Sequence, residues 1–437
     1  ADSSMESAVR RVQRVSQHIT RQHHGNDSNQ AVTRCDVMAS TPPHLRDLCA
    51  KVERFVEDKV YPLEEELHHS ADRVEAMARI KALQSEAKAA GLWALGHPKE
   101  IGGGGLPFMD YVYVNEIQGR SELAQACLGT HSLQDSLMLF KWGTEDQKRQ
   151  YLHGLVAADI YPSFAMTEPD VVSSDPLGIK TRAVLSQGVW TINGVKWWTT
   201  GASTATYTAV MARTEFDDET PPHLCFSIIL VPTNTPGYEI QRSTHVLGLQ
   251  GVEHNEVVYN NVTVPASALL GQRGHGFLIA QERLGPGRIF HCMRWLGQAQ
   301  RAFDLMCQRL VERRVRGQEL ASKQLMQQHV FDSVADITAC RLLTLAAAHK
   351  MDQGDAARAE ISVAKAFGAR ALNRVVDRAV QVYGAKGLTE DTPLSRMFRA
   401  ARAARFYDGP DEVHVTSVAR NIIARYKQGD TYRFADV

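Results

Sequence analysis

The sequence has no excess of either charge and no long apolar run. Lys and Arg total 49, and Asp and Glu also total 49, so the formal net charge of the 437 residues is zero. A balanced charge gives no indication that nucleic acid or an anionic membrane is a partner. Because no apolar run approaches the roughly 20 residues that a membrane-spanning helix needs, we expect no membrane span. The remaining composition, 44% hydrophobic and 22% charged, is typical of a globular chain long enough for two or three domains.

Cysteine is also scarce. The seven cysteines are odd in number, are scattered along the chain and form no Cys-x-x-Cys pair, and there is no His-Glu-x-x-His motif. Without paired cysteines or clustered ligands, a disulfide framework and a structural zinc site are both disfavoured. We therefore expect no metal, and a chain that works in a reducing compartment and is not secreted.

A phosphate-binding glycine loop is absent as well. Residues 102–105 are four consecutive glycines, but no Lys-Ser/Thr pair follows them and no strong strand precedes them. A P-loop needs both, so we interpret this run as an ordinary loop. The chain also shows no regular alternation of strands with helices, which disfavours a Rossmann sheet.

Hydrophobic periodicity divides the chain into a tail and three parts. Residues 1–40 are polar and lack sustained periodicity, so we interpret them as a disordered tail or linker. Because the first residue is Ala and not Met, the remnant of a transit peptide is the alternative. Helical spacing predicts an N-terminal helical domain at 41–158, and short alternating segments predict an antiparallel β domain at 159–270. Long helical patterns predict a bundle at 271–437, which makes the fold class α+β.

The individual elements are predicted from the same periodicities. The helices of the first domain are expected at 44–67, 71–90, 111–125 and 135–155. The strands are expected at 181–192, folded around a turn at 186–188, and at 207–213, 224–231 and 257–264. The helices of the bundle are expected at 277–316, 322–353 and 355–383, with a last helix at 412–426.

One stretch near the C-terminus combines a helix break with carboxylates. Residues 406–414 are Phe-Tyr-Asp-Gly-Pro-Asp-Glu-Val-His. Gly409 and Pro410 interrupt the helical pattern, because Gly tolerates unusual backbone angles and Pro can open a helix but cannot continue one. Asp408 is therefore predicted at a helix–helix junction. From these residues alone it is interpreted as an N-cap, with Asp411 as a capping-box partner three residues on.

Three motifs occur in a fixed order along this organisation. They are Phe-Ala-Met-Thr-Glu-Pro-Asp at 164–170 with Ser-Ser-Asp at 173–175, Asn-Gly-Val-Lys-Trp-Trp-Thr-Thr-Gly at 193–201, and the stretch at 406–414 preceded by Gln-Val-Tyr-Gly at 381–384. As an ordered set they resemble the flavin-dependent acyl-CoA dehydrogenase family over about residues 41–426. Together with Arg-Leu-Gly-Pro-Gly-Arg-Ile at 283–289, they are most similar to the branch that contains the mammalian family members 10 and 11.

The resemblance implies that the chain binds FAD. Met166 and Thr167 match positions that face the isoalloxazine ring, and Trp198 matches an aromatic residue packed near it. Without the resemblance, Trp198 would be interpreted as a core residue of a strand, and Arg313 as a solvated surface charge. The residues implied for the cofactor are Phe164, Met166, Thr167, Ser173, Ser174, Trp198, Thr199, Thr200, Arg313, Gln324, Gln381, Gly384, Ala385, Pro410, Asp411 and Glu412.

The resemblance also implies a reaction on an acyl-CoA thioester. Asp408 lies where most of the family has glutamate, and it would remove a proton from the carbon next to the thioester carbonyl. The β-hydrogen would leave as hydride to flavin N5. The residues implied for acyl-CoA are Ser174, Arg288 and Gly409.

The chain departs from the family pattern at three further places. Residues 285–287 are Gly-Pro-Gly where the medium-chain enzymes carry an acidic pattern, so an ion pair of those enzymes is not carried over. Arg316 replaces an aromatic residue, and Ala385 replaces a second glycine. The first of these two replacements puts the family contact at 316 in doubt, and the second implies slightly less room for close backbone approach at 385.

Two alternatives to a dehydrogenase remain open at this stage. A flavin oxidase of the same fold, either an acyl-CoA oxidase or a nitroalkane oxidase, is one of them, since aspartate is also the base of the latter. A non-catalytic member that binds flavin and acyl-CoA is the other. For the dehydrogenase, the resemblance implies an electron-transfer flavoprotein as acceptor and a homodimer or homotetramer. It also implies the mitochondrial matrix or a peroxisome in a eukaryote, or the cytoplasm in a bacterium.

Overall fold

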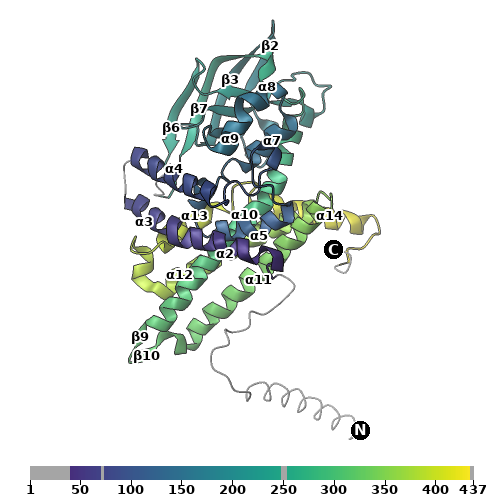
Figure 1. Ribbon diagram of the computed structural model, residues 1–437. Coiled ribbons are helices and arrows are strands. Elements are labelled where there is room, and N and C mark those ends of the chain that lie inside the picture. The colour runs from purple at the N-terminus through teal and green to yellow at the C-terminus, as the bar shows by residue number, and fades with distance from the viewer. Residues whose placement is uncertain (1–39, 70–72, 248–252, 434–437) are drawn as a thin grey trace. The chain divides into compact units, whose positions relative to one another are not determined.

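The computed structural model describes residues 40–69, 73–247 and 253–433. The tail or linker predicted for residues 1–40 therefore lies outside the described residues, apart from Ser40. Thr41 to Val437 form one compact unit. Within it, N-terminal helices are followed by a mostly antiparallel sheet and then by C-terminal helices (Figure 1). The predicted α+β fold class is thus confirmed.

Helices form the first part, as the spacing of apolar residues predicts. They are η1 (Pro43–Leu45), α2 (Arg46–Phe55), the π-helical turn η2 (Val56–Val60), α3 (Tyr61–His69), α4 (Arg73–Ala89), η3 (Lys99–Ile101), α5 (Phe108–Gln118), α6 (Ala124–Cys127), α7 (Leu133–Trp142), α8 (Glu145–Gln147), η4 (Lys148–Leu152) and α9 (His153–Ala157). The helix predicted at 44–67 corresponds to α2, η2 and α3 in direct succession. The glycine run at 102–105 is a loop, as predicted.

Two predicted helices are each interrupted. The helix predicted at 111–125 breaks after Gly119. This glycine lies so close to the C-terminal helices that a Cβ there would come within 2.2 Å of the Cα of Arg294. The helix predicted at 135–155 breaks at Gly143. Thr144 then begins a new helix through a capping box, in which its side chain accepts from the Gln147 N–H and the Gln147 side chain accepts from the Thr144 N–H.

The middle part is a single sheet. Its strands are β1 (Pro162–Ala165), β2 (Arg182–Ser186), β3 (Val189–Thr200), β4 (Tyr207–Arg213), β5 (Phe226–Pro232), β6 (Tyr238–Thr244), β7 (His254–Pro265) and β8 (Leu269–Leu270). They pair in the order β6-β7-β3-β2-β4-β5-β8, and β1 pairs with β4 in parallel. The turn predicted at 186–188 is the β2–β3 hairpin. Gln187 and Gly188 both have positive φ, 51° and 80°, which suits the twist of a two-residue hairpin.

Three strands of this sheet, β1, β6 and β8, were not predicted, and β6 shows the reason most clearly. It lies at the edge of the sheet and most of its side chains are exposed, so its sequence lacks the apolar alternation on which the prediction depends. By contrast, β4 and β5 are almost wholly buried, because both faces of the sheet are covered at these strands.

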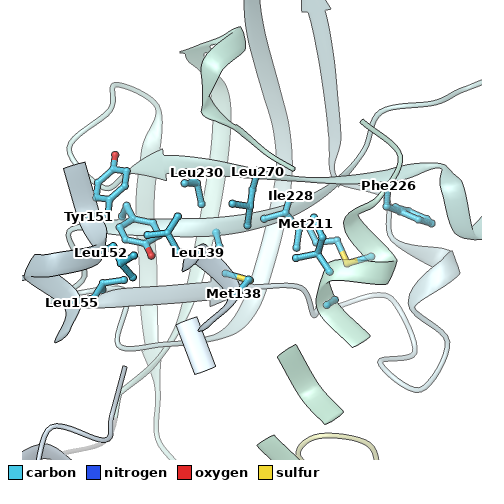
Figure 2. Packing of buried hydrophobic residues seen from close by; sticks show 14 of the residues in the cluster. Met138, Leu139, Tyr151, Leu152, Leu155, Met211, Phe226, Ile228, Leu230 and Leu270 are labelled. Atoms are coloured by element: carbon cyan, nitrogen blue, oxygen red, sulfur yellow. The ribbon is translucent and has the colours of Figure 1, made fainter. Parts of the chain in front are cut away.

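The two faces of the sheet pack into different cores. Ala209 and Met211 of β4 belong to a cluster with residues of α7, η4 and α9, whereas Val210 and Ala212 belong to a cluster on the other face. This assignment follows the two-residue period of a strand. Figure 2 shows part of the first cluster, where Met138, Leu139 and the 151–155 segment lie against β4, β5 and β8. The N-terminal helices are thereby fixed on the sheet.

The last part consists of long helices. They are α10 (Gly276–Glu312), α11 (Gln324–Asp352), α12 (Arg358–Tyr383), η9 (Gly384–Leu388), α13 (Leu394–Ala403) and α14 (Asp411–Lys427). α10 begins at the sheet, where His275 bridges to Phe226, and ends at the hairpin of β9 (Arg314–Val315) and β10 (Gln318–Glu319). The predicted helix 277–316 was too long, because Arg316 and Gly317 have positive φ and turn this hairpin.

Several properties of the described residues bear on the site. All six cysteines among them are free, and no group of three or more His, Cys, Asp or Glu side chains there could hold a metal ion. Among the same residues, no helix combines the length and the apolar character needed to cross a membrane.

Candidate active site

Asp408 lies in the turn between α13 and α14, in an unusual backbone conformation. Its φ is 55° and that of Gly409 is 99°, a region that Asp and Asn tolerate better than most residues other than Gly. The N-cap of α14 is Pro410, and no side chain caps the helix. The interpretation of Asp408 as an N-cap with Asp411 as its capping-box partner is therefore wrong. The carboxylate of Asp408 does not cap α14.

Three side chains hold the backbone of this turn. The carbonyl of Asp408 accepts from Arg288 Nε at 2.9 Å and from His414 Nε2 at 3.2 Å. The carbonyl of Gly409 accepts from Lys365 Nζ at 2.5 Å. Lys365 is fully buried, and burial lowers its pKa to about 8 against the opposing charges of Asp411 and Asp408. Three hydrogen bonds, one each from α10, α12 and α14, thus fix this turn, in which two residues have positive φ.

The carboxylate of Asp408 is enclosed but not fully bonded. His291 Nε2 lies 3.2 Å from Oδ2, although the N–H is not aligned well enough for a regular hydrogen bond. Burial alone would raise the pKa of Asp408, but His291, Arg283 and Arg288 outweigh it and hold this pKa well below its usual range. Asp408 is therefore ionised at neutral pH, and Oδ2 keeps a lone pair for an incoming proton.

Arg283 connects this carboxylate to the sheet. Its Nε and Nη2 donate to the two oxygens of Asp135 at 3.1 and 2.9 Å, and its guanidinium lies 4.6 Å from the ring centroid of Phe164 in β1. Phe164 begins the first motif, so the segment predicted to face flavin and the Asp408 carboxylate, whose pKa Arg283 helps to lower, both lie near Arg283.

The two segments predicted to face the flavin ring lie side by side. Thr167 O accepts from the Trp197 N–H at 2.8 Å, and Met166 O accepts from Lys196 Nζ at 2.9 Å. Between Lys196 and Thr199 the register of β3 against β7 shifts, and Trp198 within this bulge has a φ of 54° and is 40% exposed. The interpretation of Trp198 as a core residue is wrong. A bulge and a positive φ aim its indole outward.

The neighbouring hydroxyls fit a polar ligand beside this indole. Thr200 Oγ1 lies 2.9 Å from His254 Nδ1, and the ring of His254 is 5.0 Å from that of Trp198. Thr199 Oγ1 is buried and has no partner within the described part of the chain. Ser173 and Ser174 lie in an exposed loop beyond Met166 and Thr167. An exposed aromatic wall with hydroxyls at its edge suits the face and polar rim of a flavin.

The remaining residues predicted to bind FAD do not all lie beside the Asp408 turn. Pro410, Asp411 and Glu412 follow the turn directly, but the Asp411 carboxylate is buried and accepts from Arg370 and Arg405 at 3.0 and 2.8 Å. A second group is gathered around the far ends of α10 and α12 and the start of α11: Arg313, Gln324, Gln381, Gly384 and Ala385. From Arg288 to the end of α10 the helical rise amounts to roughly 36 Å. Within one chain, Arg313 is therefore remote from Asp408.

Sequence reasoning missed several residues of the site. His291, Arg294, Lys365 and His414 contact the Asp408 turn or each other, but none was proposed as a site residue. A signal existed on α10, since 288, 291 and 294 recur every third residue and so lie along one side of the helix. No comparable signal marks Lys365, whose sequence neighbours are those of an ordinary buried helix.

Family models of the acyl-CoA dehydrogenase N-terminal, middle and C-terminal domains match residues 42–159, 163–262 and 274–423. The chain belongs to the acyl-CoA dehydrogenase family, a family of oxidoreductases that use FAD.

Its relatives include proteins of similar length and longer ones. The chain is 42% identical to a probable acyl-CoA dehydrogenase, FadE2, of Mycobacterium tuberculosis, over 80% of this chain and 86% of that protein. It is 39% identical to mouse acyl-CoA dehydrogenase family member 10 and 37% identical to human family member 11, over 86% of this chain in each case. The match spans 37% and 50% of the length of those two proteins. Thus the chain corresponds to half or less of them.

Solved structures give the same result for the fold. A putative acyl-CoA dehydrogenase from Mycobacterium abscessus superposes with a TM-score of 0.82 at 33% identity, over 89% of this chain and all of that one. Butyryl-CoA dehydrogenase from Megasphaera elsdenii gives 0.77 at 25% identity, over 91% of this chain and all of that one. The resemblance to this family, including the branch of members 10 and 11, is therefore confirmed.

Proposed function

We propose that this chain is an FAD-dependent dehydrogenase that converts an acyl-CoA thioester into its 2-enoyl-CoA, with Asp408 as the α-proton base. The observation that carries this proposal is the Asp408 carboxylate, which is held ionised on a fixed turn with Oδ2 left without an aligned donor. A general base needs a positioned, ionised acceptor within reach of the proton. The fixed turn and the ionised carboxylate of Asp408 support this role.

The residues around Asp408 have separable roles in this proposal. Asp408 accepts the α-proton, and the backbone of Gly409 lies beside the thioester. The missing Cβ of Gly409 makes room for the His414 ring, since a Cβ there would come within 2.9 Å of His414 Nε2. As charge develops on the thioester oxygen, backbone N–H groups of the turn stabilise it, because Arg288 and Lys365 hold that turn in place. Met166, Thr167, Trp198 and Thr200 would hold the flavin, which when bound takes the β-hydrogen as hydride at N5.

Ser174 and Arg288 are proposed on the acyl-CoA side. Ser174 lies in the exposed loop after Thr167, where it can contact a ligand that lies over the flavin. Arg288 donates to the backbone of Asp408 and not to its carboxylate. Its contribution is therefore positional in addition to any contact with the thioester or CoA.

The purified protein should be yellow, contain one FAD per chain and be reduced by an acyl-CoA. The exposed Trp198 indole and the exposed Thr200 beside it are the features that a bound flavin would cover. Turnover should be measured across a panel of acyl-CoA chain lengths, with oxygen, an artificial acceptor and an electron-transfer flavoprotein compared side by side. Turnover with oxygen as the best acceptor would favour an oxidase. A protein that cannot be reconstituted with FAD would refute the proposal.

We also propose a homodimer or homotetramer in which Arg313 completes the FAD site of a neighbouring copy. Arg313 is exposed and lies roughly 36 Å along α10 from Arg288, so a second copy is needed to bring it to the flavin. Sedimentation should show a dimer or tetramer. Arg313→Met should weaken FAD binding about 10- to 100-fold, as expected for losing a charged hydrogen bond, whereas the neighbouring Arg314→Met should have little effect. An active monomer with full FAD would contradict this arrangement.

A further inference from the structure

His291 lies directly beside Asp408 although it belongs to none of the sequence motifs. Its Nε2 is 3.2 Å from Asp408 Oδ2, and both side chains are largely buried, with 21% and 17% of their surfaces exposed. The histidine comes from α10, one turn after Gly287. At that glycine a Cβ would come within 1.7 Å of Gln134 Nε2 and 3.7 Å of Asp408 Oδ2. α10 thus approaches the carboxylate closely, and His291 is its nearest polar group.

The second ring nitrogen of His291 determines where the imidazole proton lies. Arg294 Nη2 is 2.8 Å from His291 Nδ1. A guanidinium has only donors and remains protonated, so Nδ1 must be the acceptor of this bond. The proton of the neutral ring is then on Nε2, the nitrogen that faces Asp408. Burial lowers the pKa of His291 against the opposing charge of Asp408, so the ring is neutral at neutral pH.

Two aromatic rings pack against the imidazole of His291. The ring of Trp295 is stacked at 6.0 Å with an interplanar angle of 23°, and the ring of Tyr407 lies at 4.8 Å. These two aromatic residues are themselves joined, because Trp295 Nε1 donates to Tyr407 Oη at 2.6 Å. His291 therefore cannot turn away from Asp408 without disturbing a packed cluster that includes the residue before the base.

We propose that Arg294 fixes His291 in its Nε2–H form and that His291, so fixed, is a positioning residue that holds the Asp408 carboxylate in its working orientation. This inference rests on the proposed function, in which Asp408 is the base. Aspartate is one methylene shorter than the family's usual glutamate, so its carboxylate has less freedom to find the α-carbon. A donor held from a long helix restricts that freedom, while a poorly aligned contact still leaves Oδ2 able to accept a proton.

Other charged and titratable groups face Asp408 or His291 and must be kept constant in any test. They are Arg283, Arg288 and Arg294 of α10, Lys365 of α12, Tyr407 of the turn and His414 of α14. Arg283 and Arg288 remain beside the base when His291 is replaced. A change caused by His291 alone is therefore expected to be partial.

The pH profile of kcat/KM tests the positioning role. His291→Phe keeps a ring of similar size but no donor, and it should raise the pKa of the acid limb, because a donor to a carboxylate favours its ionised form. His291→Gln retains an N–H and should leave this limb near that of the native protein. His414→Phe is the matched control, because His414 contacts the backbone carbonyl of Asp408 and not its carboxylate. An unmoved acid limb in His291→Phe, or equal shifts in His291→Phe and His414→Phe, would overturn the proposal.

Two spectroscopic readouts do not depend on turnover. In the native protein labelled with 15N-histidine, His291 should appear as the Nε2–H tautomer across neutral pH, and Arg294→Met should give a mixture of tautomers. The 13C signal of the Asp408 carboxylate, assigned through its loss in Asp408→Asn, should titrate at higher pH in His291→Phe. An Nδ1–H tautomer, or a His291 ring that is charged at neutral pH, would refute the inference even if acyl-CoA reduces the flavin normally. If acyl-CoA does not reduce the native flavin, the proposed function fails, while the tautomer remains measurable.

Discussion

Asp408→Asn should lower the rate of flavin reduction by acyl-CoA roughly 10²–10⁴-fold, the usual loss for removing a general base. The substitution suits this site, because Asn has nearly the size of Asp and tolerates the positive φ of 55° found here. The hydrogen bonds that fix the turn go to the carbonyls of Asp408 and Gly409, so they survive the change. FAD content and acyl-CoA binding should therefore be retained. Rapid mixing with acyl-CoA, followed by flavin bleaching, measures the rate.

A longer base distinguishes reach from charge. Asp408→Glu keeps the carboxylate but adds a methylene, and glutamate is less suited to positive φ. It should crowd the thioester and the contact with His291, so we expect a slower reaction than the native one but a faster one than that of Asp408→Asn. If Asp408→Asn bleaches at the native rate, Asp408 has no part in the chemistry. If both variants lose FAD, the turn has a structural role that the hydrogen bonds do not reveal.

The position of Asp408 at a helix break could be predicted from sequence, but its surroundings could not. Gly409 and Pro410 mark a helix break in any context, and the ordered motifs place Asp408 at that break. The roles of His291, Arg294 and Lys365 depend on how α10 and α12 cross the turn, and no local pattern encodes a crossing. The same limit explains Arg288. The resemblance placed it near the base, while the structure shows that it donates to the carbonyl of Asp408.

Some strands could be predicted from their local sequence, whereas others depend on tertiary contacts. Strand β4 was predicted with its observed bounds, because its apolar residues carry the signal on both faces of the sheet. The edge strand β6 was not predicted, since its exposed side chains carry no such signal. Trp198 was misread without the resemblance, because the bulge that turns it outward arises from the pairing of β3 with β7. The sequence of either strand by itself does not reveal this shift in register.

One buried ion pair holds the segment that carries Met166, Thr167 and the other residues proposed to contact the flavin. Lys196 of β3 is fully buried, and its Nζ donates to Glu168 Oε1 and to the carbonyl of Met166, both at 2.9 Å. Glu168 also accepts from the backbone N–H groups of Lys180 and Thr181, at 2.8 and 2.9 Å. The pair therefore ties both ends of the exposed loop with Ser173 and Ser174 to the sheet.

Lys196→Met should lower the free energy of unfolding by about 3–5 kcal/mol, because it leaves Glu168 buried without its charged partner. Burial lowers the pKa of Lys196 only to about 8, so the pair is charged at neutral pH, where denaturant unfolding should be measured. Adding Glu168→Gln removes the unpaired charge, and the double variant should recover part of the loss. The double-mutant cycle then gives the coupling free energy between Lys196 and Glu168.

Lys59→Met is the matched control. Lys59 lies 3.2 Å from Glu86 in an ion pair that is about half exposed, so its replacement should cost at most about 1 kcal/mol. Equal losses for Lys196→Met and Lys59→Met, with no recovery in the double variant, would show that burial does not make this pair special. In that outcome Lys196→Met should also hold FAD as tightly as the native protein, because the ion pair would not be what fixes the loop.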